Sequence, residues 1–406
     1  MERTAVERPA VVDQMAAGQL AADEVAAGQL AAGQALVDEV AADEVAAGPA
    51  GTAPAGAPGS MPAPLERAVY GLFVTSALEL AIRHGVTARL AEHGAASGPE
   101  LAAALDLDGE TLGRLLTVLR AFGVLTADPH GRYAVPDAAL PYLDPREPRY
   151  LGGFVRHLME STTERLPRLD DRLSRTRPGA EAAAPEPLDE PFAELYRDAA
   201  ATARFLDAMW QLSFDVSVEL VELAGLAGAR ELVDVGGAGG PFAVAALLRH
   251  PALRATVFDL PQVGAKLAEA RATHRLGDRL AFAPGDFHRE ELPPGDCLAF
   301  GYILSDWTDE TCLALLRKAY RACAPGGAVL VMERLFDEDG YLPPATAAMN
   351  LAMHVETQGR HRTAAEYLGL LRAAGFTGCE LRRSGREKHL LLGRRPQERP
   401  AEGGAP

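Results

Sequence analysis

Three short apolar segments in the second half of the chain end on residues that could bind a nucleoside. The run ELVDV at 231–235 continues into a glycine-rich turn at 236–240. Glycines at such a turn let backbone N–H groups and the start of the following helix approach a ligand closely. Twenty-three residues beyond Gly236, the next apolar run ends near Asp259, whose carboxylate could accept both hydroxyl protons of a ribose. We therefore expect the turn and this acid to bind one nucleotide-like ligand.

The third segment ends on Asp286 and Phe287. An acid there could accept a hydrogen bond from an adenine amino group, and the phenyl ring could stack on the base. A dinucleotide-binding turn would prefer glycine at position 242, where this chain has Phe242, so pyrophosphate binding is disfavoured. The alternative is that these glycines and acids are ordinary turn residues of an α/β protein and bind no ligand. We favour ligand binding because the turn and both acids each follow a strand of their own.

A parallel sheet would bring these residues together. Apolar runs alternate with segments of helical spacing between residues 231 and 395. We expect strands at 231–235, 255–260, 280–287, 297–303, 328–335 and 389–395, and helices at 241–250, up to about 274, at 310–324 and at 363–376. Strand–helix repeats at this spacing predict an α/β fold, a doubly wound and mainly parallel sheet covered on both faces. Ligands bind such sheets beyond the carboxyl ends of the strands, where the strand order reverses.

The rest of the chain is organised around this sheet. We expect a low-complexity, disordered tail at 1–62, a winged-helix domain at 63–175, a helical linker with substrate-pocket helices at 176–225, the catalytic domain at 226–396, and a disordered end at 397–406. The tail repeats units such as AAGQL and AADEV every five residues, a period that builds no continuous apolar stripe. A docking helix is the alternative for this segment.

The winged-helix part is predicted from three helical segments followed by the strand-like run GRYAV. Its would-be recognition helix begins with Asp108 and Glu110, whose carboxylates would repel phosphate. We therefore interpret it as a structural or dimerisation module, with DNA binding as the alternative.

Composition excludes several function classes. The chain has 406 residues, 48% of them hydrophobic and 24% charged, with a net charge of −16. An acidic chain is a poor partner for nucleic acid or anionic lipid. No run approaches the ~18 apolar residues of a membrane span, and the first residues do not resemble a secretory signal. The four cysteines follow no metal or disulfide spacing, so we expect a cytoplasmic protein.

Several motifs in register resemble one family. The segments DVGGAGG, FDLPQV, DRLAFAPGDF, LSDWTDETC and GRHRTAAEYLGLLRAAGF are similar to the small-molecule O-methyltransferases, which include acetylserotonin, caffeic-acid and bacterial natural-product enzymes. The resemblance covers residues 65 to 395. It implies a class I methyltransferase sheet preceded by a winged-helix dimerisation domain, a homodimer, and S-adenosylmethionine as cofactor. The cofactor-binding residues implied are Asp234, Gly236, Gly237, Gly239, Asp259, Leu260, Asp286 and Phe287.

The catalytic segment departs from the family. Relatives read HDW, with the histidine as general base, whereas this chain has Ser305, which has no useful basicity near neutral pH. Relatives also often carry Lys or Arg near the adenine, where this chain has Gly301, and a glutamate that helps to orient the base, where it has His361. We hypothesise that His361, helped by Glu333, removes the proton while Ser305 only hydrogen-bonds. The alternative is that positioning alone supports methyl transfer.

Two further histidines and a few apolar residues complete the candidate site. His354 precedes His361 by two helical turns and, with Glu356, could form a metal site, but we expect a pocket-wall residue and no metal. His288 is expected to be a solvated loop residue. By the resemblance, His354, Met353 and Trp210 would contact the acceptor.

We predict an S-adenosylmethionine-dependent methyltransferase of secondary metabolism that acts on a small, partly aromatic molecule. Oxygen is the expected acceptor atom. Because the HDW histidine is absent, methylation of an activated carbon is an alternative. A methyltransferase-like protein with a non-methylating role, such as a ligand sensor or a related hydroxylase or decarboxylase, is the remaining alternative.

Overall fold

The computed structural model describes residues 61–160, 169, 173, 196, 198–357 and 359–397, without the side chains of residues 355 and 356. Nearly all of the predicted tail at 1–62, the whole loop at 175–191 and nearly all of the C-terminal end at 397–406 lie outside this set. Residues 1–71 form one unit and 72–406 another. The described part of the first unit is residues 61–71, which includes the beginning of helix α2.

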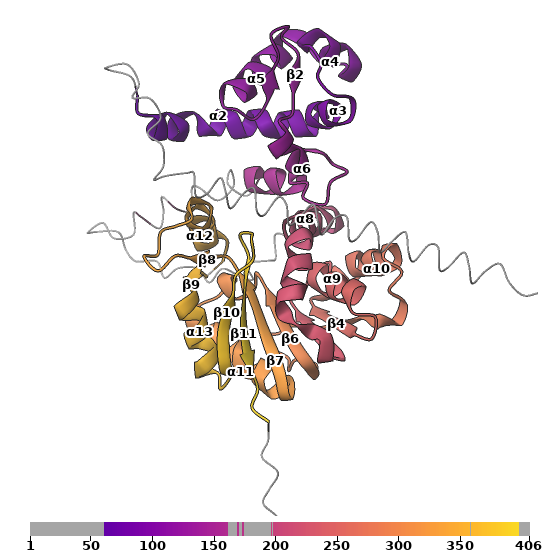
Figure 1. Ribbon diagram of the computed structural model, residues 1–406, viewed down its shortest axis with the longest axis vertical. Helices are drawn as coiled ribbons and strands as arrows, with labels where there is room; N and C mark the ends of the chain where they lie inside the picture. The colour runs from indigo at the N-terminus through magenta and orange to yellow at the C-terminus, as the bar shows by residue number, and fades with distance from the viewer. Residues whose placement is uncertain are drawn as a thin grey trace, which may run out of the picture. The chain divides into compact units, whose positions relative to one another are not determined.

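Within the described residues, the second unit contains a seven-stranded sheet in the order β10-β11-β7-β6-β3-β4-β5 (Figure 1). Its strands are β3 Glu231–Val235, β4 Arg254–Asp259, β5 Leu280–Pro284, β6 Gly295–Gly301, β7 Cys323–Glu333, β10 Thr377–Arg382 and β11 His389–Arg394. Strands β3 to β7 are parallel, and β11 runs antiparallel to both of its neighbours. The strand order reverses between β3 and β6, and this confirms the doubly wound class.

Helices cover the sheet on both faces because the strands are apolar on both sides. Helices α8 Ala199–Ala224, α9 Pro241–Arg249 and α10 Gly264–Thr273 pack on one face, and α11 Asp309–Ala322 and α13 Ala364–Ala373 on the other. In β3, Leu232 belongs to the first core, whereas Val233 and Val235 belong to the second. This alternation with a period of two residues divides the buried side chains between two layers.

The helical region of the second unit has a separate core. Helix α2 Ala63–Arg83 is followed by α3 Val86–His93, α4 Gly98–Leu105, α5 Gly109–Ala121, the paired strands β1 Thr126–Ala127 and β2 Tyr133–Ala134, and α6 Leu140–Leu143. Ile82, Leu101 and Leu116 are among its buried residues. Helices followed by a pair of short strands were expected, but the first expected helix is divided into α2 and α3. The assignment as a winged helix stays a prediction.

The acidic start of α5 has a local structural cause. The Asp108 carboxylate accepts a hydrogen bond from the Thr111 N–H at 2.8 Å and so caps the helix, while Glu110 pairs with Arg114 at 2.7 Å.

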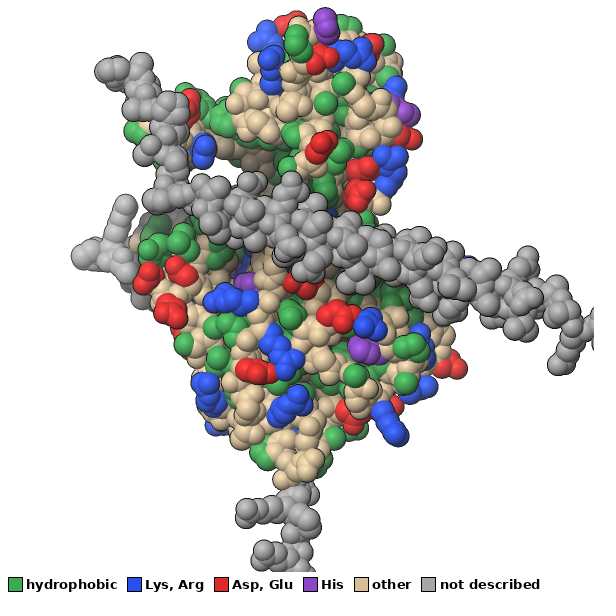
Figure 2. Space-filling view, in the orientation of Figure 1, with side chains coloured by type: hydrophobic (Ala, Val, Ile, Leu, Met, Phe, Trp, Pro, Cys, Tyr) green, Lys and Arg blue, Asp and Glu red, His purple; other side chains and the backbone are tan. Residues whose placement is uncertain are grey.

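On the face shown in Figure 2, acidic and basic side chains of the described residues are interspersed. Among those residues, no helix is both long enough and apolar enough to cross a membrane.

Candidate active site

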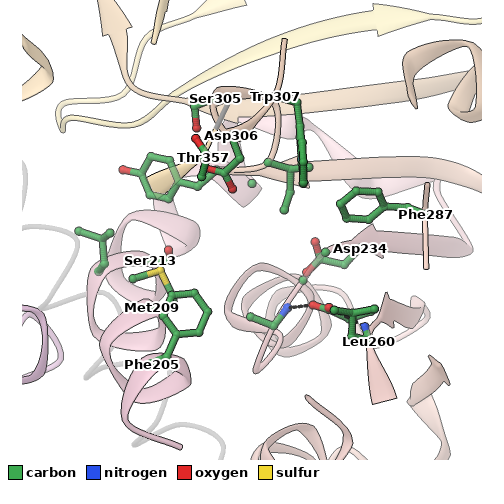
Figure 3. Close-up of a pocket in the computed structure, with 18 of the residues that line it drawn as sticks. Phe205, Met209, Ser213, Asp234, Leu260, Phe287, Ser305, Asp306, Trp307 and Thr357 are labelled. Atoms are coloured by element: carbon green, nitrogen blue, oxygen red, sulfur yellow. Dashed lines mark hydrogen bonds between the residues drawn. The ribbon is translucent and has the colours of Figure 1, made fainter. Parts of the chain in front are cut away.

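A cavity of about 1020 Å³ opens beyond the carboxyl ends of β3, β4 and β6. One wall is helix α8, with Phe205, Met209 and Ser213, and another is the loop that carries Ser305 and Asp306 (Figure 3). Their spacing of four residues places Phe205, Met209 and Ser213 on one side of α8. The cavity therefore lies at the reversal of strand order, where the sequence predicted a ligand.

The glycine turn after β3 is shaped by close approaches. Gly236 has a positive φ of 66°, and a Cβ atom there would collide with the Ile303 side chain. A Cβ atom on Gly237 would lie 2.7 Å from the Asp234 carboxyl carbon. Glycine is therefore required at both positions, by backbone conformation at the first and by space at both. Gly236, Gly237 and Asp234 all line the cavity, as expected.

Asp259 lies at the tip of β4 with 7% of its surface exposed. Its Oδ2 accepts a hydrogen bond from the Ala238 N–H at 2.8 Å, and its Oδ1 accepts one from the Leu260 N–H at 2.7 Å. These bonds join the acid to the glycine turn and fix its orientation. Burial raises the pKa of Asp259 to about 6. Because each carboxylate oxygen has a second lone pair, the group can still accept two hydroxyl protons.

Asp234 is buried at the end of β3 and accepts a hydrogen bond from the Ala243 N–H at 3.2 Å. Burial raises its pKa to about 7, against the opposing effect of that hydrogen bond and of the Lys388 ammonium. The turn therefore lies between two buried carboxyl groups, which together favour a ligand with positive charge.

The segment after β5 forms the far end of the cavity. Asp286 and Phe287 line it, as the sequence predicted, and so does His288. His288 is exposed in this loop, as expected, and its ring also lies edge-on to Trp307 with centroids 4.3 Å apart. The Lys318 ammonium donates hydrogen bonds of 2.7–3.1 Å to three backbone carbonyls of this segment, those of Phe287, His288 and Glu290. One lysine on α11 thus holds the segment in place.

The loop that replaces HDW is held by two buried charged residues. Glu333 at the end of β7 accepts hydrogen bonds through Oε1 from the N–H groups of Leu304 and Ser305 at 2.9 and 3.2 Å. Arg362 has no exposed surface, and it donates hydrogen bonds to the carbonyls of Leu304 and Trp307 at 2.9 and 2.8 Å. Ser305 lines the cavity, whereas Glu333 lies behind it.

His361 lines the cavity with only 4% of its surface exposed. Neither ring nitrogen has a hydrogen-bond partner among the described residues, and the Glu333 Oε2 atom has none either, so Glu333 does not contact the imidazole through a hydrogen bond. Burial and the positive charges of Arg334 and Arg362 lower the pKa of His361 to about 4. The imidazole is therefore neutral near pH 7.

Three predicted contacts lie elsewhere. Gly239 and Trp210 do not line the cavity: Gly239 faces Lys266, and Trp210 stacks on Phe214 with centroids 4.8 Å apart. His354 is on the exposed side of helix α12, Pro344–Glu356. The reason is helical rotation, because a step of one residue turns a side chain by about 100°. Met209 and Met353 face the cavity, so their neighbours Trp210 and His354 turn away from it.

The proposed metal alternative loses one of its ligands with His354. Within the described ranges no group of three potential ligands is close enough to hold a metal ion. The side chain of Glu356 lies outside the described residues.

Sequence reasoning missed Tyr302, Arg334 and Lys388, which also line the cavity. Tyr302 follows β6 with a positive φ of 57°, a conformation that is strained for a tyrosine. Lys388 directly precedes β11 and is almost fully buried. The predicted strand begins at residue 389, one residue after Lys388. A lysine next to an apolar strand normally indicates that the strand ends in solvent.

Comparison with known proteins decides the family. Residues 182–377 match the family described as an O-methyltransferase domain. A 3-hydroxy-5-methyl-1-naphthoate 3-O-methyltransferase from Streptomyces sahachiroi is 32% identical over 315 residues, which cover 77% of this chain and 89% of that enzyme. This chain belongs to the O-methyltransferase family.

Three further methyltransferases are similar over different lengths. Acetylserotonin O-methyltransferase from Bos taurus is 36% identical over 212 residues, 52% of this chain. The match spans 60% of that enzyme and 47% of the one from Gallus gallus, about half of these relatives' length. The structure of human N-acetylserotonin methyltransferase in complex with SAM aligns with a TM-score of 0.72 and 27% identity, covering 82% of this chain and 97% of that one. The methyltransferase fold class predicted from sequence is confirmed.

Proposed function

We propose that this O-methyltransferase family member transfers a methyl group from S-adenosylmethionine to a hydroxyl group of a small, partly aromatic molecule in natural-product biosynthesis. The observation that carries the proposal is Asp259 at the tip of β4, bonded to the glycine turn and facing a cavity large enough for two small molecules. The solved relative that aligns with the chain was crystallised with SAM, which supports the same ligand here.

The described residues fit this cofactor part by part. Asp259 and the Leu260 segment would hold the ribose, Asp286 and Phe287 the adenine, and the turn at Gly236 and Gly237 the methionine part. S-adenosylmethionine supplies an electrophilic methyl group, and its positive charge suits the neighbouring buried carboxyl groups of Asp234 and Asp259. Gly239 is left out of this set because it faces away from the cavity.

The acceptor would bind on the apolar side of the cavity. Phe205 and Met209 from α8 and Met353 from α12 line that side, together with the hydroxyl groups of Ser213 and Thr357. Such a wall favours a mostly apolar molecule with one or two polar groups. This agrees with the naphthoate acted on by the Streptomyces sahachiroi relative.

His361 is our candidate for removal of the acceptor's proton. Its imidazole is neutral near pH 7, lines the cavity and has no partner among the described residues, so a ring nitrogen is available to accept a hydrogen bond. Glu333 would act by holding the Ser305 loop rather than by bonding to the imidazole. Ser305 remains a hydrogen-bonding neighbour. Its presence at the HDW position is the observation that favours the carbon-acceptor alternative.

We also propose that the protein works as a cytoplasmic homodimer. Large apolar side chains are exposed along α2, including Val69, Leu72 and Phe73, and a second copy of the chain would cover them. All four cysteines are free, which fits a reducing compartment.

Calorimetric titration of the full chain with S-adenosylmethionine tests the function. We expect saturable binding by the wild type, a loss of about 10-fold or more in Asp259→Asn, and no change in the exposed control Asp278→Asn. Acceptors would then be screened with a ¹³C-labelled methyl donor, because the carbon shift distinguishes a methoxy group from a carbon-bound methyl. Absence of binding by the wild type contradicts the proposal.

A further inference from the structure

Lys388 is a buried cation that the mechanism above does not use. It precedes β11, and its neighbour His389 pairs with Glu333 at the end of β7. Only 3% of its surface is exposed, yet it lines the cavity. Its ammonium lies 3.9 Å from the centre of the Tyr302 ring. The side chain therefore extends from the β11 edge of β7 to the tip of β6.

The reach of this side chain depends on Gly301. A Cβ atom on Gly301 would lie 3.1 Å from the Lys388 ammonium nitrogen and 3.8 Å from its Cε. Gly301 has no positive φ, so its backbone does not require glycine. The missing side chain leaves the space that the lysine fills. By the resemblance described above, position 301 often carries Lys or Arg in relatives, so a positive charge is retained at this tip but comes from another strand.

The ammonium lies near the buried carboxyl groups of Glu333 and Asp234 but in contact with neither. Among the described residues it forms neither a hydrogen bond nor an ion pair within 4.0 Å. The charges that act on it are the carboxyl groups of Glu333 and Asp234 and the guanidinium of Arg334. The ring of Tyr302 offsets only part of the cost of burying a positive charge. Because the ammonium lines the cavity and has no hydrogen-bond partner among the described residues, it is free to bind an anionic group of a ligand.

Two other cations of the cavity each have an acidic partner, although the Nη1 atom of Arg334 has no hydrogen-bond partner among the described residues. Arg334 donates to Glu387 at 2.9 Å, and Arg289 lies 3.4 Å from Asp286 at the far end. Lys388 is the cavity cation that acts on Asp234, over which the glycine turn folds. Its charge repels the sulfonium and the amino group of S-adenosylmethionine. The only anionic group of that molecule is its α-carboxylate.

We infer that Lys388 binds the α-carboxylate of the cofactor's amino-acid part. The inference rests on the proposed function. It assigns a cofactor-binding role to a residue outside the motifs of the sequence.

Calorimetry with two ligands tests the assignment. S-adenosylhomocysteine carries the amino-acid part, whereas 5′-methylthioadenosine lacks it. In Lys388→Met we expect affinity for S-adenosylhomocysteine to fall about 10- to 100-fold, as for loss of a charged hydrogen bond, with affinity for methylthioadenosine nearly unchanged. Lys266→Met, which removes a lysine outside the cavity, is the matched control.

The outcomes separate the two proposals. Equal affinity of wild type and Lys388→Met for S-adenosylhomocysteine overturns the inference, as does a raised acceptor KM with unchanged cofactor affinity. Equal loss for both ligands, with a lower Tm, assigns Lys388 a structural role and also overturns it. If the wild type binds neither ligand, the proposed function itself fails.

Discussion

At the scale of single residues, the unusual feature of this site is a neutral, buried histidine. His361 carries no hydrogen bond from its ring, and its pKa is lowered to about 4 by burial and two guanidinium groups. Protonation therefore removes its lone pair only as the pH falls through about 4, rather than near the ordinary value of 6.5.

We expect His361→Gln to lower kcat about 10²-fold while cofactor affinity stays unchanged, because the variant loses a proton acceptor but not a cofactor contact. At saturating cofactor, the acid limb of the wild-type pH–kcat profile should lie near pH 4 to 5 and be absent in the variant. Stopped-time assays across pH 4–9 measure both. An unchanged kcat would contradict the role of His361 as proton acceptor and would indicate that positioning alone supports methyl transfer.

At the scale of elements, the loop at 304–307 is held by Arg362, which is buried and donates to two of its carbonyls and to Asp309. Arg362→Lys keeps the charge but cannot make all of these bonds. We expect a loss of unfolding free energy of about 3 kcal/mol, because buried partners are left unpaired.

Arg360 is a close control for this change. It pairs with the same Asp309 but is 44% exposed, so Arg360→Lys should alter stability by about 0.5 kcal/mol or less. Urea unfolding of both variants measures the difference. Equal losses would show that burial of Arg362 does not set its contribution.

The segment that carries Asp286 and Phe287 depends on Lys318. Removing its three hydrogen bonds with Lys318→Met should loosen the segment and weaken cofactor binding several-fold, although Lys318 does not line the cavity. Arg317→Met, on the same helix, serves as the control. The effect should appear in cofactor KM and not in kcat at saturation. A fall in kcat alone would exclude this positioning role.

Most strands could be predicted because parallel strands buried on both faces are continuous apolar runs, as ELVDV shows. Strand β10 was missed because TGCELR is polar and half exposed at the sheet edge. Helices α2 and α3 were expected as one segment, yet Gly85 separates them with a φ of 75°. Motif spacing predicted that the residues at the strand ends lie together, and Asp234, Asp259 and Asp286 do line one cavity. Lys388 was not predicted there, because only the folded sheet brings it to Gly301.

At the scale of the whole molecule, the exposed apolar residues of α2 argue for self-association. Leu72 and Phe73 are each 67% exposed. We expect the wild type to be a dimer and Leu72→Lys/Phe73→Lys to be a monomer, because burying two lysines in an interface is unfavourable. Light scattering after gel filtration measures the mass. Leu248→Lys changes an exposed leucine on α9 and should remain dimeric. A dimeric double variant would exclude α2 as the interface.

The two buried acids of the cavity also connect ligand exchange to the acidity of the surroundings. With pKa values of about 7 and about 6, Asp234 and Asp259 hold protons part of the time near neutral pH. A sulfonium ion lowers both pKa values and expels protons, whereas the neutral thioether of the demethylated product expels fewer. By linkage, a lower pH therefore weakens the binding of S-adenosylmethionine more than the binding of the demethylated product. Product inhibition should therefore deepen as the pH falls, and the heat of donor binding should vary with the ionisation enthalpy of the buffer.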